Sequence, residues 1–271
     1  MPNIRPPAVA GLFYPAEPKQ LAHDVQQLLV QALLHVPHPF TLLPKALVVP
    51  HAGYVYSGAI AATAYATIRP IAARIRRVVL LGPIHRVAVH GLALPGTDAF
   101  DTPLGRVMLD AAGARAIAHL PQVGISAQAH ALEHSLEVQL PFLQSLLTDF
   151  TLLPLAVGMA TGEEVAEVLD AVWGGDETLI VISSDLSHYL PYATAQRVDS
   201  ETAQSILDLR QPIAHDHACG GTPISGLIIA ARRHHLEPHL LDLRNSGDTA
   251  CPRDQVVGYA AFAFTEDERQ P

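Results

Sequence analysis

Short apolar runs alternate with longer amphipathic stretches along this chain of 271 residues. Runs in which Val, Ile and Leu follow one another with little polar interruption are typical of strands that are covered on both faces. Four such runs predict buried strands over Ala46–Pro50, Arg77–Gly82, Leu152–Gly158 and Leu179–Ser183. A terminal strand is expected over Val256–Phe264.

The stretches between these strands are Ala-rich or carry apolar residues at helical spacing, which favours helices. We expect helices over Leu21–Leu34, Gly58–Ile75, Glu163–Val172, Thr202–Leu209 and Ile224–His234.

Two local features refine the helical stretches. Ser57 precedes the Ala-rich stretch and is a residue type preferred at helix N-caps. Leu132, Leu136, Leu140 and Leu143 follow one another at spacings of three or four residues, which predicts one apolar helical face.

Strands that alternate with helices predict an α/β fold, with a mostly parallel central sheet flanked by helices on both faces. No change of composition and no Gly/Ser-rich linker divides the chain. We therefore expect a single domain over residues 1–271.

The composition excludes several classes of function. The chain is 49% hydrophobic and 16% charged, as expected for a folded protein with a large core. No apolar stretch reaches the roughly 18–20 residues of a membrane span, and the N-terminus lacks the apolar segment of a secretory signal. The net charge is −9, with no basic cluster beyond Arg74–Arg77. We expect a cytoplasmic protein that binds neither nucleic acid nor membrane.

Histidines follow three of the predicted strands. His51 comes directly after the first strand, His85 follows the second, and Asp185 and His188 follow Leu179–Ser183. Ligands of open α/β sheets bind beyond the carboxyl ends of the strands, where neighbouring exits meet. Because histidine is the commonest metal ligand, three histidines at equivalent exits indicate a functional site.

Of the two cysteines, only Cys219 has a suggestive setting, because two glycines follow it and allow close approach of the backbone. A buried free cysteine is otherwise an ordinary small apolar residue, and that interpretation is preferred for Cys251. His215 and His217 flank Cys219 and could chelate with it, although an ordinary polar loop accounts for them equally well.

At this point several motifs resemble one family. AGLFYP, PHAGYVYSG, LGPIH, EHSLEVQLPFL, SSDLSHY, CGGTP and the closing SGDT…VVGYAAFAF occur in order from about residue 6 to residue 264. They resemble the Memo family, which corresponds to protein B of the AmmeMemoRadiSam system in bacteria and archaea. Memo-like proteins are similar in fold to class III extradiol dioxygenases, which open catechol rings with non-haem Fe(II).

The resemblance implies a mononuclear metal site. His51 and His85 match the two histidine ligands of the family, and Cys219 matches its cysteine, where the dioxygenases have a carboxylate. His188 matches the acid/base histidine of the dioxygenases, and we place Asp185 beside it as the residue that orients the imidazole. Iron is the first expectation for the metal. A thiolate ligand moves the preference toward copper or zinc and argues against assigning dioxygenase activity.

The resemblance also suggests supporting residues and partners. His134 and Glu137 belong to the EHSLE stretch and are expected to support the metal site from outside the ligand shell. Tyr54 is expected either to line the cleft or simply to pack. Proteins related to AMMECR1 and radical SAM proteins are candidate partners by resemblance, beside an unknown small molecule or peptide.

Other motifs favour competing functions. The sequence HALEH, residues 130–134, fits the H-x-x-E-H pattern of zinc peptidases. Ser184 lacks the flanking glycines of a hydrolase nucleophile and is expected to cap a helix. Neither glycine-rich phosphate-binding pattern occurs.

Two functions of different classes therefore stay open beside the peptidase. The first is a metal-dependent redox enzyme of unknown substrate. The second is a non-catalytic adaptor that binds a peptide or partner protein in the same cleft.

Overall fold

Four parallel strands form the middle of the main sheet in the computed structural model. They lie side by side in the order β2 (Pro44–Val49), β9 (Thr178–Ser183), β3 (Arg77–Pro83) and β8 (Thr151–Val157). Each coincides with a predicted strand to within two residues. The structure describes residues 3–34, 43–250 and 252–266.

Antiparallel pairings extend this parallel centre at both edges. Beyond β2 lies β12 (Val256–Glu266), which pairs with β11 (Leu236–Asn245) and with β10 (His188–Leu190). Beyond β8 lies β4 (Leu92–Leu94), followed by β7 (Val123–Ile125). The sheet is therefore mixed with a parallel centre, and the predicted α/β class is confirmed.

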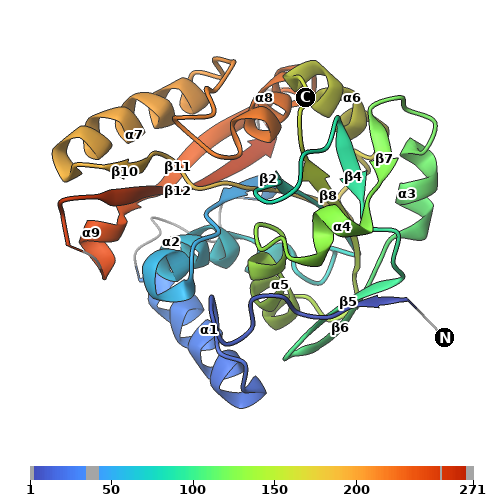
Figure 1. The fold of residues 1–271 in the computed structure, drawn as a ribbon, viewed down its shortest axis with the longest axis horizontal. Helices are drawn as coiled ribbons and strands as arrows, with labels where there is room; N and C mark the ends of the chain where they lie inside the picture. The colour runs from blue at the N-terminus through green and yellow to red at the C-terminus, as the bar shows by residue number, and fades with distance from the viewer. Residues whose placement is uncertain (1–2, 35–42, 251, 267–271) are drawn as a thin grey trace.

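Helices cover both faces of the main sheet (Figure 1). One face carries α1 (Pro18–Ala32), α2 (Tyr54–Thr67) and α5 (Leu140–Leu146), and the other carries α6 (Gly162–Ala171), α7 (Tyr192–Leu207) and α8 (Gly221–Arg233).

A small separate sheet consists of β1 (Ile4–Arg5), β5 (Ala99–Thr102) and β6 (Gly105–Met108). The shorter helices are α3 (Ala111–Ile117), α4 (Ala127–Ala131), α9 (Ser246–Thr249), and the 3-10 turns η1 (Arg69–Ile71) and η2 (Glu137–Gln139). Within the described ranges, no helix has the length and apolar character needed to cross a membrane.

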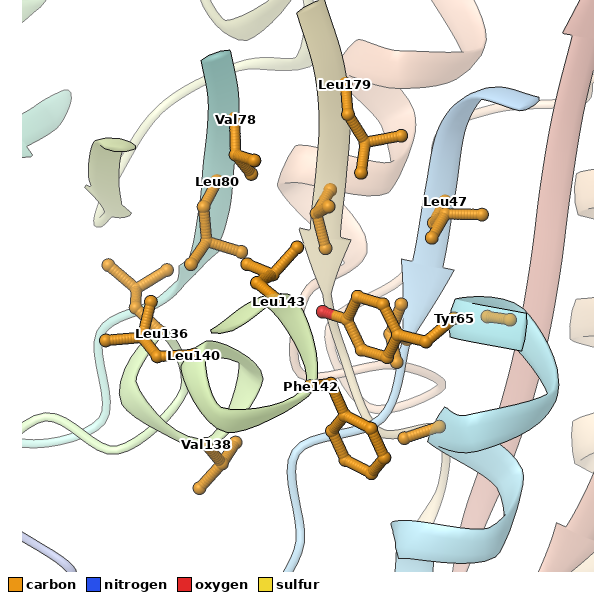
Figure 2. Packing of buried hydrophobic residues seen from close by; sticks show 14 of the residues in the cluster. Leu47, Tyr65, Val78, Leu80, Leu136, Val138, Leu140, Phe142, Leu143 and Leu179 are labelled. Atoms are coloured by element: carbon orange, nitrogen blue, oxygen red, sulfur yellow. The ribbon is translucent and has the colours of Figure 1, made fainter. Parts of the chain in front are cut away.

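The apolar runs of the central strands divide their side chains between two cores. In β2, Leu47 and Val49 pack under α1 and α2, whereas Ala46 and Val48 pack on the opposite face. Successive side chains of a strand point to opposite faces, so a strand covered on both sides needs an unbroken apolar run. Figure 2 shows part of the first core, in which Tyr65 of α2 stacks on Phe142 of α5 and Leu47 projects from β2.

The helix that follows β2 begins earlier and ends earlier than predicted. Gly53, not Ser57, occupies its N-cap, and the Ser57 hydroxyl donates a hydrogen bond to the carbonyl of Ala52. The helix ends at Thr67 instead of reaching Ile75. Pro70 explains this end, because a proline has no N–H to donate and its ring clashes with the carbonyl four residues before it.

The leucine series from 132 to 143 does not form one helix, and that prediction is wrong. The helix α4 ends at Ala131, and a turn and η2 precede α5. Leu132 is 61% exposed, whereas Leu136 is buried. Two features interrupt the helix. The carboxylate of Glu133 accepts the backbone N–H groups of residues 134 and 135, and Pro141 occupies the first turn of α5.

Candidate metal centre

The parallel register brings the exits of β2 and β9 together. Val49 pairs with Ser183, and the backbone N–H of Ser184 donates to the Val49 carbonyl over 2.8 Å. Two residues beyond β2, the backbone N–H of His51 donates to Asp185 Oδ1 over 2.7 Å. Since strand β3 pairs with the other side of β9, its exit with His85 reaches the same place.

Three histidines gather at these exits. Among the described residues, His51, His85 and His134 form a group whose potential ligand atoms all lie within 4.8 Å of one another. Their ring centroids are 5.3 Å apart for His51 and His85, 5.4 Å for His51 and His134, and 4.7 Å for His85 and His134. His51 is buried, His134 is half-buried and His85 is exposed, so the group is accessible from one side.

Hydrogen bonds determine which nitrogen of His51 carries its proton. Ser183 Oγ donates its single proton to the carbonyl of Ser135, and it accepts an N–H from Gln139 Nε2. The remaining contact, 2.9 Å to His51 Nδ1, is therefore donated by the imidazole. As a result, the lone pair of His51 is on Nε2.

Glu133 orients the other two histidines. Its Oε1 lies 2.9 Å from His85 Nδ1 and 3.2 Å from His134 Nδ1, and a carboxylate can only accept. Both imidazoles are therefore protonated on Nδ1, with the lone pair on Nε2. A carboxylate behind a metal-binding histidine fixes its tautomer and orientation in many metal sites. The three side chains thus fit a metal ion.

The electrostatics agree with a neutral, ligating imidazole at His51. Burial, together with the neighbouring His134 and His85, holds the pKa of His51 well below its usual value. Burial alone would raise the pKa of Glu133, but hydrogen bonds from His134 and His85 outweigh it and hold the pKa far below the usual range. The site therefore contains a permanent carboxylate behind two of the histidines, and a His51 imidazole that keeps its lone pair near neutral pH.

Cys219 lies next to this group. Its Sγ is 3.3 Å from His51 Nε2, the nitrogen with the free lone pair. A Cβ at Gly220 would lie 2.6 Å from Ser184 Cβ, so the glycine after the cysteine is what lets this segment approach the end of β9. Burial, and Asp185 second, raise the pKa of the Cys219 thiol to about 12, a shift that a bound cation would oppose.

His188 and Asp185 occupy different places around His51. His188 is half-buried at the start of β10, where burial lowers its pKa and a hydrogen bond to the Leu186 carbonyl opposes this shift. Asp185 accepts the backbone N–H of His51. Burial raises the pKa of Asp185 to about 6, against that hydrogen bond. The carboxylate therefore positions the His51 backbone, and its orientation of His188 stays a prediction.

The segment that carries His188 is anchored from behind by Asp199 of α7. The backbone N–H of Ser187 donates to Asp199 Oδ1 over 3.0 Å. The carbonyl of Ser187 accepts the backbone N–H of Gly258 over 2.8 Å. Asp199 is buried, and this burial raises its pKa to about 6 against the hydrogen bonds from Ser187.

We expect the Asp199→Asn variant to gain stability relative to the wild type as the pH rises from 4 to 6. The pKa of the Asp199 carboxyl is 3.8 in an ordinary setting and about 6 in the folded protein. Between these values the folded state binds more protons at Asp199 than the unfolded state does, so the contribution of Asp199 to wild-type stability falls as the pH rises. The difference should reach roughly 1–3 kcal/mol at neutral pH, measured by urea unfolding with chelator. An Asp149→Asn control on the surface should show no such change, and a trend of opposite sign would contradict the raised pKa.

The HALEH stretch does not bring its two histidines together. His130 is buried, and its Nε2 lies 2.7 Å from the carbonyl of Ala93. His134 instead joins the cluster with His51 and His85. Because α4 ends at Ala131, the helical spacing that a peptidase motif requires is not present. The geometry gives the peptidase interpretation no support.

Glu137 and Tyr54 serve the surrounding fold. The Glu137 carboxylate is fully buried and accepts hydrogen bonds from Arg5 and the Tyr14 hydroxyl and from the backbone of residues 8 and 9. The Tyr54 hydroxyl donates to the carbonyl of Val138. Both therefore hold neighbouring segments in place. Cys251 lies outside the described residues.

Sequence reasoning overlooked the residues that orient the histidines. Ser183 of β9 contacts His51 directly, and Gln139 of η2 acts on it through the Ser183 hydroxyl. Glu133 stood out in the sequence only as part of the HALEH peptidase pattern. A polar residue at the end of an otherwise apolar strand, as Ser183 is in β9, was the one available signal. His134 was expected to support the site from outside, and the structure places it inside the ligand-forming group.

Fold and site together define an α/β protein with a three-histidine candidate metal centre at the carboxyl ends of its parallel strands. The chain belongs to the Memo-like protein family, whose profile matches residues 5–263.

Relatives cover nearly the whole chain. A MEMO1 family protein of Aquifex aeolicus is 35% identical over 97% of this chain and 99% of its own length. A MEMO1 family protein of Methanosarcina barkeri is 35% identical over 96% of this chain and 99% of its own. Among solved structures, an uncharacterized protein from Escherichia coli K12 is 14% identical with a TM-score of 0.49, covering 80% of this chain and 98% of that chain.

Proposed function

We propose that this chain is a metal-dependent enzyme that holds one metal ion between His51, His85 and His134, with the Cys219 thiol beside this group. The observation that carries the proposal is that three histidines offer potential ligand atoms within 4.8 Å of one another, while a contact at each Nδ1 leaves the Nε2 lone pair available. Three protein ligands with one open side are typical of catalytic rather than structural metal sites.

The donor set restricts the metal. Imidazole nitrogens suit iron, copper and zinc, and a neighbouring thiolate moves the preference toward copper and zinc. Iron remains the first expectation from the resemblance to the dioxygenase fold. When bound, such an ion polarises a substrate oxygen or exchanges electrons with the substrate.

The protein's own groups supply proton transfer and alignment. His188 donates to the Leu186 carbonyl, and its lowered pKa leaves the imidazole neutral near pH 7. Its second ring nitrogen is then free to take a proton from a substrate. Glu133 and Ser183 hold the ligating rings, and Asp185 holds the His51 backbone, so none of these needs to reorient during the reaction.

Metal analysis of protein purified without oxygen tests the proposal. We expect about one ion per wild-type chain, and almost none in a His51→Ala/His85→Ala double variant, because two of the three imidazoles are gone. A His23→Ala/His119→Ala variant, which removes two exposed histidines outside the cluster, should bind as much metal as the wild type. Equal metal content in all three proteins would contradict the proposal.

One feature favours the adaptor function as a second candidate. Two large apolar side chains next to site residues in the sequence are exposed, namely Leu132 beside Glu133 and Tyr189 beside His188. Exposed apolar groups near a cleft are typical of interaction surfaces. If the chain is an adaptor, a pull-down with the wild-type protein should recover a stably bound partner. The Cys219→Ser/His188→Ala double variant should lose that partner. Unchanged partners in that pull-down would favour the enzyme.

A further inference from the structure

A cavity of about 350 Å³ lies beside the candidate metal centre. Its walls come from the segments that follow β3 and β8 and from the start of α8. This volume is within the usual range of small-molecule sites, roughly 300–1,000 Å³. The lining residues are Pro83, Ile84, Val87, Ala88, Val89, Val157, Gly158, Met159, Ala160, His215, Cys219, Thr222 and Pro223.

The cavity shares a wall with the metal centre. Cys219 lines the cavity, and its Sγ is also 3.3 Å from His51 Nε2. Ile84 lines it too and directly precedes His85. A molecule in the cavity therefore comes within contact distance of a side chain that touches the metal cluster.

The walls of the cavity offer little to a charged molecule. None of the lining residues is Asp, Glu, Lys or Arg, and most are apolar. The backbone of the walls is largely paired with itself, since Ile84 N–H donates to the Val157 carbonyl and Met159 N–H donates to the Val89 carbonyl. A charged group placed here would give up part of its hydration and would meet no carboxylate, ammonium or guanidinium in return.

Close packing of the two wall segments keeps this backbone pairing in place. A Cβ at Gly158 would lie 2.1 Å from the Val89 carbonyl oxygen. Only a glycine allows the segment after β8 to lie this close to the segment after β3. Closely packed, mutually hydrogen-bonded backbone segments therefore form the apolar part of the cavity.

The polar lining groups are Cys219, His215 and Thr222. Cys219 contacts the metal cluster, and His215 is near enough to His188 to lower its pKa. The lining thus combines an apolar wall with polar groups that adjoin the proposed metal and proton-transfer groups.

We propose that this cavity binds the substrate as a small uncharged molecule, with an apolar body between the β3 and β8 exits and one polar group directed at Cys219 and the metal cluster. That the ligand is a substrate rests on the proposed function, whereas the preference for an uncharged ligand follows from the cavity itself. The cavity would reject sugar phosphates, nucleotides and polyamines.

Three probes of equal size test the preference for an uncharged ligand. They are 4-fluorobenzyl alcohol, 4-fluorobenzylammonium and 4-fluorobenzoate, followed by fluorine NMR line broadening on the full chain. The alcohol and the ammonium are compared on protein as purified, and all three after treatment with chelator, so that benzoate cannot bind through a metal ion. We expect the alcohol to bind at least about tenfold more tightly than either ion.

A matched pair of variants places the binding in the cavity. Met159 lines the cavity and is 59% exposed, and Met108 lies on β6 away from it and is 49% exposed. Met159→Asp should reduce the preference for alcohol over ammonium to below about threefold, whereas Met108→Asp should leave it unchanged. Ala88→Asp, also in the lining, should repeat the effect of Met159→Asp.

The outcomes separate this inference from the proposed function. If the alcohol does not bind, if the three probes bind equally, or if both Asp variants of the lining behave like Met108→Asp, the inference is wrong. Metal content is measured on the same samples. Loaded metal without probe selectivity overturns only the cavity assignment, and probe selectivity without metal overturns only the metal enzyme.

Discussion

His134→Ala is expected to lower metal affinity by at least about 100-fold, a larger effect than the loss of a supporting residue usually has. The imidazole is one of three whose potential ligand atoms lie within 4.8 Å of one another. The matched control is His130→Ala, which removes a buried histidine from the same short stretch. Because His130 binds the Ala93 carbonyl, its loss should change stability and leave metal affinity within about threefold of the wild type. Competition with a chromogenic chelator measures the metal affinity of both variants.

The same titration decides between two ligand sets. The family resemblance implies His51, His85 and Cys219, and the structure groups His51 and His85 with His134. If Cys219→Ala abolishes binding while His134→Ala leaves it intact, the thiolate is the third ligand and His134 is a support. If both variants lose affinity, both side chains bind the ion. Intact binding in both would contradict each set.

Glu133→Gln is expected to lower metal affinity by about 10–100-fold, although Glu133 does not reach the metal position itself. Its Oε1 accepts from Nδ1 of both His85 and His134. A glutamine presents an N–H to at least one of these rings or loses one of the two contacts. One imidazole would then turn or change tautomer, and its Nε2 lone pair would leave the site.

Glu137→Gln is the matched control, since Glu137 is buried four residues away and pairs with Arg5 instead of with a histidine. This variant leaves a buried guanidinium without its carboxylate and should cost roughly 3 kcal/mol of stability in urea unfolding. Metal affinity of the folded protein should stay within about threefold. Equal losses of metal affinity in the two variants would mean that Glu133 acts through general stability rather than through the histidine rings.

The central strands and the place of the site were predictable because they follow local patterns. Continuous apolar runs such as Leu179–Ser183 indicate strands covered on both faces, and the structure places them at the centre of the sheet. His51 and His85 directly follow two of these strands. Since the exits of parallel strands meet at one edge, their proximity needed no knowledge of side-chain geometry.

The stretch from 130 to 143 was beyond sequence reasoning because its conformation depends on distant contacts. Its leucine spacing favoured one helix, but Glu133 accepts the backbone N–H groups of a turn and also binds His85 from β3. A tertiary carboxylate–histidine contact thus replaced the local helical hydrogen bonds. The consequence for function is that His134, and not His130, joins His51 and His85 in the candidate metal centre.

The amino-acid sequence by itself therefore determined the α/β architecture, the edge of the sheet where the site lies, and His51 and His85 as its first two members. Only the tertiary structure decided that His134 joins them, that Glu133 and Ser183 set their tautomers, and that Cys219 lies between the three histidines and the cavity. The physical reason is the separation along the chain of the residues that interact. Hydrophobic periodicity is local, whereas ligand geometry arises where segments far apart in the chain hydrogen-bond to one another.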